Sequence, residues 1–363
     1  MRSLTTAIVA TVLMWLAAFP ASASPTLLFE PSTGKILYGE DIDDIWHPAS
    51  LTKLMTAYVT FDAIKKGEIH LSDKIPCSLV ATLQPPSKVG LKVGQTLTVE
   101  QALQAVIIKS ANDVTVMLAE AISGSEAAFI ERMNVTAKRL GMTHTSFVNT
   151  NGLPDPGQLT SARDIAKIAR AVTAEYPEYA NYWAMPAMHI GKRRLGSHNA
   201  LLKTFPGADG LKTGFTCDSG YNVVASATRD GRRLMAVVLG ESSGNERAIR
   251  AASLLEYGFQ NYDWKQIFNS STIDTDPMDP NFKTVMSVRD SVAAWGCGGK
   301  RRHMAGGKHK SKRKLAAQKS AKQTAGAPDD AKSALKGPEA DDGSDDIVPT
   351  APEPKAAAQA TQE

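Results

Sequence analysis

The 363-residue chain has few of the residues that hold metal ions or form covalent cross-links. It contains three cysteines, Cys77, Cys217 and Cys297, and no Cys-x-x-Cys pair. Its seven histidines are scattered, and no two of them lie three or four residues apart. These absences argue against a zinc site, and we expect neither a metal nor another cofactor. The odd number of cysteines leaves at least one thiol unpaired within the chain.

The chain also lacks a hydrophobic run of the length that a membrane-spanning helix needs. The apolar run near its start, from Ala7 to Phe19, is short for a span. It follows the positive charge of Arg2 and precedes the small residues Ala21-Ser22-Ala23, a pattern typical of a secretory signal peptide cleaved after Ala23. An uncleaved membrane anchor is the alternative. Both interpretations predict export, to the periplasm or the extracytoplasmic face of the membrane.

Net charge is absent from most of the chain. Residues 1–299 contain 28 basic and 28 acidic side chains. Lys300–Lys322 contains ten basic and no acidic residues, and Gln323–Glu363 contains nine acidic and three basic ones. We expect no nucleic-acid partner. We predict that the basic block Lys300–Lys322 contacts anionic membrane lipid or wall polymer, with a solvated linker as the alternative.

The pattern of expected elements places strands at both ends of one domain. Two apolar runs around Pro31-Ser32-Thr33-Gly34 predict a hairpin in Pro25–Asp41. Asp230-Gly231 predicts a second hairpin in Tyr221–Glu241. The helical signals lie at about 51–66, 98–109, 113–121, 125–141, 161–174 and 245–259. The fold class is therefore α+β, in which the N- and C-terminal segments share one antiparallel sheet and a helical cluster is inserted between them.

Composition divides the chain into four regions. After the signal peptide (1–23), the α+β domain spans 24–264. Residues 265–298 are a linker or a short remnant of a C-terminal module, in which five apolar residues indicate a short amphipathic helix: Phe282, Val285, Met286, Val292 and Trp295. Residues 299–363 have almost no apolar side chains and predict a disordered tail, basic and then acidic.

The pattern Ser-x-x-Lys occurs four times, at Ser32, Ser50, Ser311 and Ser333, so the spacing alone identifies nothing. Ser32 lies in the predicted hairpin turn, and the last two lie in the tail. Ser50 and Lys53 lie at a predicted helix start, on one face of the helix. There the pair is either a nucleophile with its own base or a helix-capping serine followed by a solvated lysine.

Two further motifs follow Ser50-Leu51-Thr52-Lys53 in order. Ser110-Ala111-Asn112 lies in a break between two helices, and Lys212-Thr213-Gly214, which occurs once, lies just before the second hairpin. This ordered set resembles the signature of the penicillin-recognising serine enzymes. The flanking segments "TGKILYGED", "NTNGLPDPG" and "GADGLKTGFT" extend the resemblance. From about Thr26 to Tyr262 the chain resembles the serine-type D-alanyl-D-alanine carboxypeptidases, which are low-molecular-mass penicillin-binding proteins.

The resemblance implies an acyl-enzyme on Ser50. Its expected reaction is removal of the terminal D-alanine from peptidoglycan stem pentapeptides, and β-lactam antibiotics are expected to inhibit it covalently. Lys53 is the expected general base, which requires burial and a second cation, Lys212, to lower its pKa. Ser110 is expected to bridge the two lysines and to pass a proton to the leaving amine.

The resemblance also implies a set of substrate-binding residues. Asn112 is expected to hold the substrate amide, and Lys212, Thr213 and Gly214 to bind around the terminal carboxylate. The backbone N–H groups of Ser50 and Phe215 are expected to form the oxyanion hole.

This chain departs from the family pattern at two places. Relatives often have a polar or aromatic side chain at the position of Phe215, which here is expected to contribute only its backbone. His198 stands near the place where relatives often have an arginine, so the side chain that assists carboxylate binding is left open between His198, Arg193 and Arg194. Cys217, close to the third motif, is expected to be a passive buried thiol.

Two alternatives belong to other functional classes. A class A β-lactamase needs a carboxylate that activates the deacylating water, on a loop between the second and third motifs. The corresponding stretch, "FVNTNGLPDPGQ", has Asp155 but no Glu-x-x-Leu-Asn pattern. A non-catalytic wall-binding protein is the other alternative, and the intact motifs argue against it.

Overall fold

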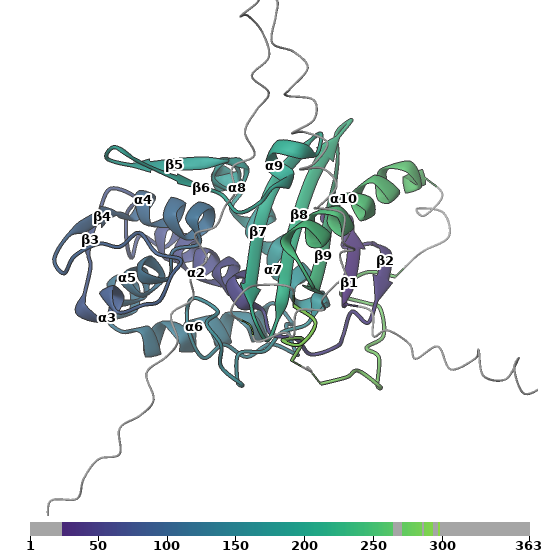
Figure 1. Cartoon of the computed structure of the whole chain (residues 1–363), viewed down its shortest axis with the longest axis horizontal. Helices are drawn as coiled ribbons and strands as arrows, with labels where there is room; N and C mark the ends of the chain where they lie inside the picture. Colours follow the sequence, from purple (N-terminus) through teal and green to yellow (C-terminus); the bar gives the residue numbers. More distant parts are fainter. Residues whose placement is uncertain (1–23, 264–270, 285–286, 293–296, 298–363) are drawn as a thin grey trace, which may run out of the picture.

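The structure is a computed structural model that describes residues 24–263, 271–284, 287–292 and 297 (Figure 1). Its main sheet has the strand order β2-β1-β9-β8-β7, and its paired neighbours run antiparallel. The N-terminal hairpin thus pairs directly with the last strand of the domain, which confirms the predicted α+β class. The strands are β1 Thr26–Phe29, β2 Ile36–Glu40, β7 Ala208–Thr216, β8 Gly220–Arg229 and β9 Arg232–Glu241.

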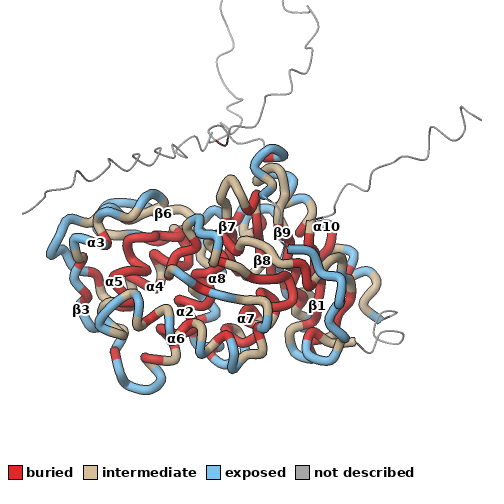
Figure 2. Tube along the Cα trace, turned by 90° about the horizontal axis from the view of Figure 1, so that it is seen from below, coloured by how far each residue is buried: buried red, intermediate tan, exposed pale blue. Residues whose placement is uncertain are grey.

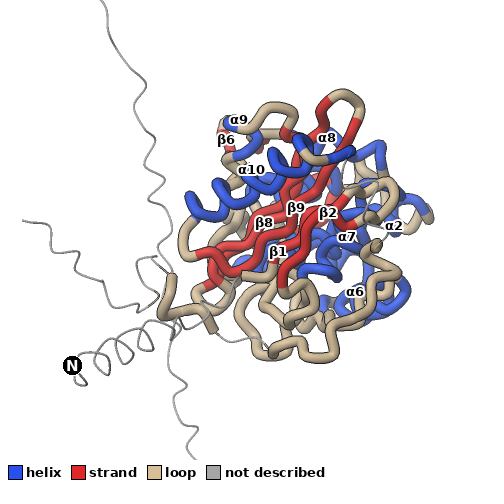
Figure 3. The backbone as a smooth tube through the Cα atoms, turned by 90° about the vertical axis from the view of Figure 1, so that its right-hand side faces the viewer, coloured by secondary structure: helices blue, strands red, loops and turns tan. Residues whose placement is uncertain are grey.

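Helices cover both faces of this sheet (Figure 3). Side chains alternate between the two faces of a strand. Leu28 of β1 and Leu234 of β9 therefore pack under α10 (Gly244–Gln260), whereas Leu27 and Met235 face the helical cluster. The buried residues run continuously through the helical cluster and the sheet (Figure 2).

The helical cluster is built around α2 (Lys53–Lys65), which continues the short 3₁₀ helix η1 (Ala49–Thr52). The cluster also contains α4 Val99–Gln104, the π-helical turn η2 Ala105–Lys109, α5 Asn112–Ser123, α6 Glu126–Arg139 and α7 Ala162–Glu175. Every residue of α2 from Lys53 to Phe61 is buried. The sequence predicted a broad apolar stripe here, but the helix is enclosed on all sides and carries a lysine into the core.

The predicted helix starts are confirmed where local capping controls them. Thr98 and Gln101 form a complete capping box, and the side chains of Ser125 and Ser161 accept hydrogen bonds from the first turns of α6 and α7. The sequence did not predict the smaller elements: β3 Lys74–Pro76, α3 Leu79–Thr82, β4 Thr96–Thr98, η3 Pro177–Tyr179, α8 Ala180–Ala184, β5 Ala187–Ile190, β6 Arg193–Gly196 and α9 Leu201–Thr204.

The described residues 271–284, 287–292 and Cys297 run back along the domain, and we call them the return segment. Ile36 N–H donates to Ser271 O (3.0 Å) and Ile273 N–H donates to Gly34 O (2.9 Å), which attaches the segment to the N-terminal hairpin. The sequence predicted a linker or a remnant of a module here and did not predict these contacts.

The amphipathic helix predicted in this region is wrong for Phe282 and for residues 287–292, because none of them is helical. Other residues of that prediction, as well as the predicted signal peptide and the predicted disordered tail, lie outside the described residues. None of the described helices is long and apolar enough to cross a membrane.

The cysteines correct one expectation and confirm another. Cys217 and Cys297 form a disulfide across 80 residues of sequence, so the interpretation of Cys217 as a passive thiol is wrong. Cys77 is buried with a free thiol, which confirms that one cysteine stays unpaired.

Candidate active site

Ser50 and Lys53 lie together at the start of the buried helix. Lys53 Nζ lies 2.9 Å from Ser50 Oγ, and it also donates to Asn112 Oδ1 (2.7 Å) and to the backbone oxygen of Asn151 (2.6 Å). Ser50 lies inside η1, whose N-cap is Pro48 and has no capping side chain. Of the two interpretations of this pair, the geometry supports a nucleophile with its base and does not support a capping serine.

The environment of Lys53 favours the neutral form of its amine. Burial removes the ammonium group from water, and the nearby charge of Lys212 repels it, so the pKa of Lys53 lies well below its usual value. Asp113 acts weakly in the opposite direction. A neutral amine close to a serine hydroxyl can accept its proton.

Ser110 lies where the chain turns sharply between two helices. It has a left-handed conformation (φ 63°, ψ 36°) between η2 and α5. Lys212 Nζ donates to its Oγ (2.9 Å) and to the backbone oxygen of Thr213 (2.9 Å). The side chain that contacts Lys53 from this motif is that of Asn112. The predicted role of Ser110 as a bridge between both lysines stays a prediction.

Lys212 lies just before the β8–β9 hairpin, as the sequence predicted, in the strand β7, which the sequence did not predict. Its side chain is buried, and this burial, followed by the charge of Arg247, lowers the pKa of Lys212 to about 7. The charge of Lys212 also lowers the pKa of Lys53, so both buried amines lose a proton more readily than an exposed lysine does.

The side-chain amide of Asn112 is hydrogen-bonded to other residues of the protein. Its Oδ1 accepts from Lys53, and its Nδ2 donates to the backbone oxygens of Pro85 (2.9 Å) and Pro86 (3.2 Å). In this arrangement Asn112 orients Lys53 and joins α5 to the loop between α3 and β4. Binding of the substrate amide by Asn112 stays a prediction.

Two glycines allow backbone segments to pack directly against the nucleophile. A Cβ on Gly214 would lie 2.9 Å from Ser50 N, and a Cβ on Gly152, whose φ is +86°, would lie 1.8 Å from Ala49 O. No larger residue fits either place without moving the backbone. Gly214 thereby holds β7, and with it Phe215, beside Ser50. The ring of Phe215 stacks on Tyr221 with 4.2 Å between centroids, consistent with a role for its backbone alone.

Arg247 is the residue that sequence reasoning missed. It lies in the first turns of α10, donates to the backbone oxygens of Asn222 (3.5 Å) and His198 (3.4 Å), and lies over the ring of Tyr221. Removal from water lowers the pKa of Arg247 to about 10, so the side chain is still cationic at neutral pH. Asn222 pairs with Gly214 across β7 and β8, so Arg247 lies close to the third motif, and its charge also lowers the pKa of Lys212.

The sequence left the side chain that assists carboxylate binding open between three residues, and the structure uses each of them differently. Arg193 donates to the backbone oxygen of Val89 (2.9 Å), Arg194 lies in the β5–β6 hairpin, and His198 contributes its backbone oxygen to Arg247. In the sequence, Arg247 appears as one of several charges in a helix. Only the packing of α10 on β8 brings it close to the third motif.

The order of motifs and this geometry agree with the comparison to protein families. Residues 16–243 match D-alanyl-D-alanine carboxypeptidase. The chain belongs to the D-alanyl-D-alanine carboxypeptidase family. It is 36% identical over 252 residues to D-alanyl-D-alanine carboxypeptidase DacF of Bacillus subtilis, which covers 68% of this chain and 64% of DacF. It is 30% identical to DacB2 of Mycobacterium tuberculosis, over 65% of this chain and 82% of DacB2.

Solved structures of family members have the same fold. Penicillin binding protein 5 of Haemophilus influenzae superposes with a TM-score of 0.64 at 36% identity, over 66% of this chain and 71% of that one. Penicillin-Binding Protein D2 of Listeria monocytogenes in its cefotaxime-bound form superposes with a TM-score of 0.60 at 32% identity, over 66% and 97%. The chain matches 60% to 64% of the length of DacF and of two Dac relatives from Escherichia coli and Haemophilus influenzae.

Proposed function

We propose that the chain is a serine D-alanyl-D-alanine carboxypeptidase that removes the terminal D-alanine from peptidoglycan stem pentapeptides. One observation carries this proposal: Lys53 is buried 2.9 Å from Ser50 Oγ with its pKa held low, in a chain of this family. A buried neutral amine beside a serine is the arrangement that nucleophilic catalysis without a histidine requires. Binding of β-lactams, as in the cefotaxime-bound relative, belongs to the same proposal.

The proposed reaction follows from the positions of the two lysines. Lys53 takes the proton of Ser50, whose oxygen attacks the carbonyl carbon between the two D-alanines. The C–N bond breaks, the leaving amine takes the proton that Lys53 had accepted, relayed through Ser110, and D-alanine departs. Water then attacks the acyl-enzyme and gives a proton to Lys53, which returns it to Ser50 Oγ as the ester bond breaks. The shortened peptide leaves with a new carboxylate. The N–H groups of Ser50 and Phe215 stabilise the oxyanion in both steps.

The surroundings of Lys53 favour slow release of a penicillin acyl group. Its three partners are a hydroxyl, an amide oxygen and a backbone oxygen, none of which is a carboxylate. Asp155, the carboxylate on the loop between the motifs, is exposed and accepts from Gly157 N–H. The class A β-lactamase alternative is therefore not favoured.

One experiment tests the proposal in two steps. The purified chain is incubated with a fluorescent penicillin, and mass spectrometry locates the adduct, which we expect on Ser50 and persisting for many minutes. Release of D-alanine is then measured from a pentapeptide that ends in D-Ala-D-Ala, with Ser50→Ala as the inactive control. An acylated chain that releases no D-alanine would contradict the carboxypeptidase proposal, and rapid loss of label with drug hydrolysis would favour the lactamase.

Arg247 is expected to bind the substrate carboxylate together with Lys212. Arg247→Ala should lower kcat/KM for the pentapeptide about tenfold to a hundredfold, because hydrogen bonds to charged groups contribute about 1.5–3 kcal/mol. The matched control is Arg250→Ala, because Arg250 lies on the same helix as Arg247 but pairs with Glu40 at the surface. For a peptide with an amidated C-terminus, Arg247→Ala should leave kcat/KM unchanged. An equal loss of kcat/KM with both peptides would exclude recognition of the carboxylate by Arg247.

Export is a further part of the proposal. A disulfide between Cys217 and Cys297 is consistent with a periplasmic or other extracytoplasmic location, since disulfides persist in oxidising compartments. We expect the mature chain to begin at Ser24, which the mass of the exported protein would test.

The basic block Lys300–Lys322 is proposed to contact anionic lipid or wall polymer by salt-sensitive attraction. At low salt, the full chain should sediment with anionic vesicles and a chain that ends at Gly299 should not. Equal sedimentation of both chains would exclude a contribution of the block to membrane binding.

A further inference from the structure

One fully buried polar side chain lies between the nucleophile and the third motif and takes no part in the proposed reaction. Asn222 lies in β8 and pairs directly with Gly214 of β7. Residues directly opposite each other in an antiparallel pair point to the same face of the sheet. A Cβ on Gly214 would lie 3.1 Å from Pro48 O, so the loop that leads to the nucleophile packs on this face, within reach of the Asn222 amide.

Both ends of the Asn222 amide are hydrogen-bonded. Its Nδ2 donates to the backbone oxygens of His47 (3.0 Å) and Pro48 (3.2 Å), which lie just before the nucleophile in the sequence. Its Oδ1 accepts from Gly240 N–H (2.8 Å) in β9. The side chain of Asn222 therefore attaches the loop before the nucleophile to the central strands of the main sheet.

The sheet is irregular at this point. Two residues of β9, Leu239 and Gly240, lie opposite Asn222 alone, which makes a β-bulge. Gly240 has a left-handed φ of +87°, and a Cβ there would meet the ring of Trp46, so only glycine fits. β-Bulges change the direction of side chains and are frequent next to active sites. This bulge gives the Asn222 side chain a partner in β9 and thereby fixes the orientation of its amide.

The loop needs such a restraint because Ala49, the residue before Ser50, has a left-handed conformation (φ 47°). This conformation is unfavourable for a residue other than glycine and persists only where the surrounding structure holds it. Ala49 O accepts from Thr52 Oγ1 (2.9 Å), and Asn222 holds the two carbonyl groups that precede Ala49. The conformation of Ala49 sets the direction of the Ser50 N–H, which is one of the two groups assigned to the oxyanion hole.

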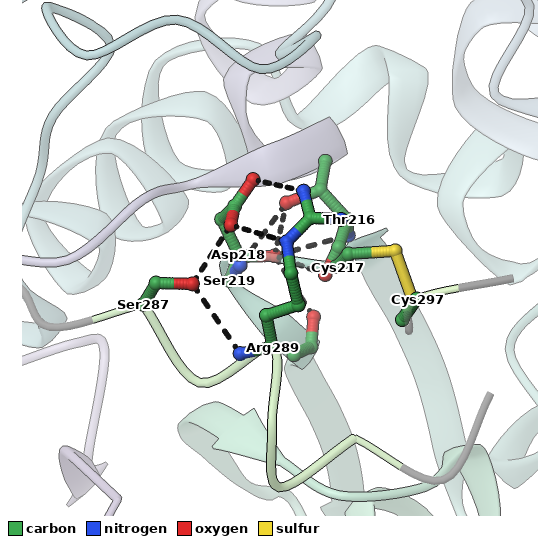
Figure 4. Close-up of a disulfide and its surroundings, with 8 residues drawn as sticks. Thr216, Cys217, Asp218, Ser219, Ser287, Arg289 and Cys297 are labelled. Carbon is green, nitrogen blue, oxygen red and sulfur yellow. Dashed lines mark hydrogen bonds and ion pairs between the residues drawn. A yellow bond between two sulfur atoms is a disulfide. The ribbon is translucent and has the colours of Figure 1, made fainter. Parts of the chain in front are cut away.

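The strand β7 is itself fixed relative to Asn222. In the turn that joins β7 to β8, Thr216 N–H and Oγ1 both bond to Ser219 Oγ (3.0 and 2.8 Å), and the Cys217–Cys297 disulfide attaches the turn to the return segment (Figure 4). The register between the two strands is therefore well defined. Bonds from Asn222 to the loop thus place the nucleophile relative to β7.

We propose that Asn222 is a positioning residue, which sets the distance between the N–H groups of Ser50 and Phe215 and thereby the rate of acylation. The inference rests on the proposed acyl-enzyme mechanism, to which it adds a residue that touches no reacting atom. Within the described part of the chain, the bonds of its side chain go to the loop and to β9, and not to Lys212 or Thr213. Initial binding at those two residues should therefore not need Asn222, whereas the chemical step should.

The test measures acylation of the full chain by increasing concentrations of a fluorescent penicillin. The limiting rate reports the chemical step, and the concentration that gives half of this rate reports initial binding. Asn222→Leu keeps a similar volume but removes all three hydrogen bonds of the side chain. It should lower the limiting rate about tenfold to a hundredfold, since a misplacement of roughly 1 Å can cost about a hundredfold, and leave initial binding nearly unchanged.

Two further variants support this comparison. Asn222→Ser can still donate one hydrogen bond, so its limiting rate should lie between those of the wild type and Asn222→Leu. The matched control is Ser226→Ala, because Ser226 is also a fully buried polar residue of β8 but accepts from Arg233 Nε (2.8 Å), away from the nucleophile. It should keep both the limiting rate and initial binding.

Several outcomes would overturn the inference. An unchanged limiting rate in Asn222→Leu, or an equal loss of rate and of initial binding, would exclude a positioning role, and so would an equal effect of Ser226→Ala. If Asn222→Leu does not fold, Asn222→Ser decides in the same way. Loss of folding in both variants, seen by thermal unfolding, would mean that Asn222 supports the whole fold. A wild-type chain that penicillin does not acylate would instead contradict the proposed function on which the inference rests, so the two failures are distinguishable.

Discussion

Lys53→Met is expected to lower the rate of Ser50 acylation by penicillin about a thousandfold, since general-base catalysis contributes roughly 10²–10⁴. Methionine has a similar length and fills the buried channel of Lys53, but it cannot accept the proton of Ser50 Oγ, 2.9 Å away. The substitution also leaves Asn112 Oδ1 and the backbone oxygen of Asn151 without their donor. A moderate loss of stability should therefore accompany the loss of acylation.

Two control variants separate the base from its charge and from the helix. Lys53→Arg keeps a cation that does not lose its proton at ordinary pH, so we expect it to be nearly as inactive as Lys53→Met. Lys65→Met changes an exposed lysine of the same helix and should acylate at the wild-type rate. The measurement is the rate of fluorescent penicillin labelling, with thermal unfolding to show that each variant is folded. A Lys53→Met variant that retains a tenth of the rate would exclude Lys53 as the base.

Arg163→Met is expected to lower the melting temperature by about 10 °C. The Arg163 and Asp43 side chains are only 5% and 3% exposed, and Nε–Oδ1 and Nη2–Oδ2 distances of 2.6 and 2.8 Å join them. Breaking a buried ion pair costs about 3–5 kcal/mol because one charge is left uncompensated, and about 2–4 °C is lost per kcal/mol in a domain of this size. Arg163 also binds Asp276, so its substitution should weaken the attachment of the return segment as well.

The pH dependence of this loss follows from the Asp43 carboxyl. Burial acts to raise its pKa, but hydrogen bonds from Arg163 and from Asp279 N–H outweigh burial and hold the pKa below its usual value. A depressed pKa stabilises the fold above the unfolded value of about 3.9, and this contribution disappears as the pH falls through the lower folded value. The difference between wild type and Arg163→Met should therefore be largest near neutral pH and shrink below about pH 4.

Arg170→Met is the matched control for this prediction. Arg170 lies on the same helix and also reaches the return segment, through Asp274, but its pair is 27% and 46% exposed. Exposed pairs contribute about 0–1 kcal/mol, so the melting temperature should fall by no more than about 4 °C. Similar losses in both variants would mean that burial of the Arg163 pair has no special role.

Features that depend on neighbours in sequence could be predicted, and features that depend on packing could not. The Asp230-Gly231 hairpin and the Ser125 and Ser161 caps were predicted correctly because each is formed by residues within one or two turns. The strand β7 was missed. Its sequence, ADGLKTGFT, has no alternating apolar pattern, and it is a strand because it pairs along its length with β8.

The sequence by itself determined the family and the chemical groups of the site. Ser50, Lys53, Ser110 and Lys212 are recognisable because their residue types, order and spacing are written in the chain. What those groups can do was decided only by the tertiary structure. The pKa of Lys53 is low because a helix enclosed on all sides carries the amine out of water and close to Lys212.

Two pairings likewise arise only from the packed fold. Three cysteines allow three pairings, and Cys217 meets Cys297 because the return segment, 80 residues away in sequence, is held against the β7–β8 turn. Arg247 reaches Asn222, the β8 residue that pairs with Gly214, because α10 packs across β8 and β9. Such contacts join residues that are distant in sequence. They depend on how the whole core packs, so they cannot be predicted from a local pattern of residues.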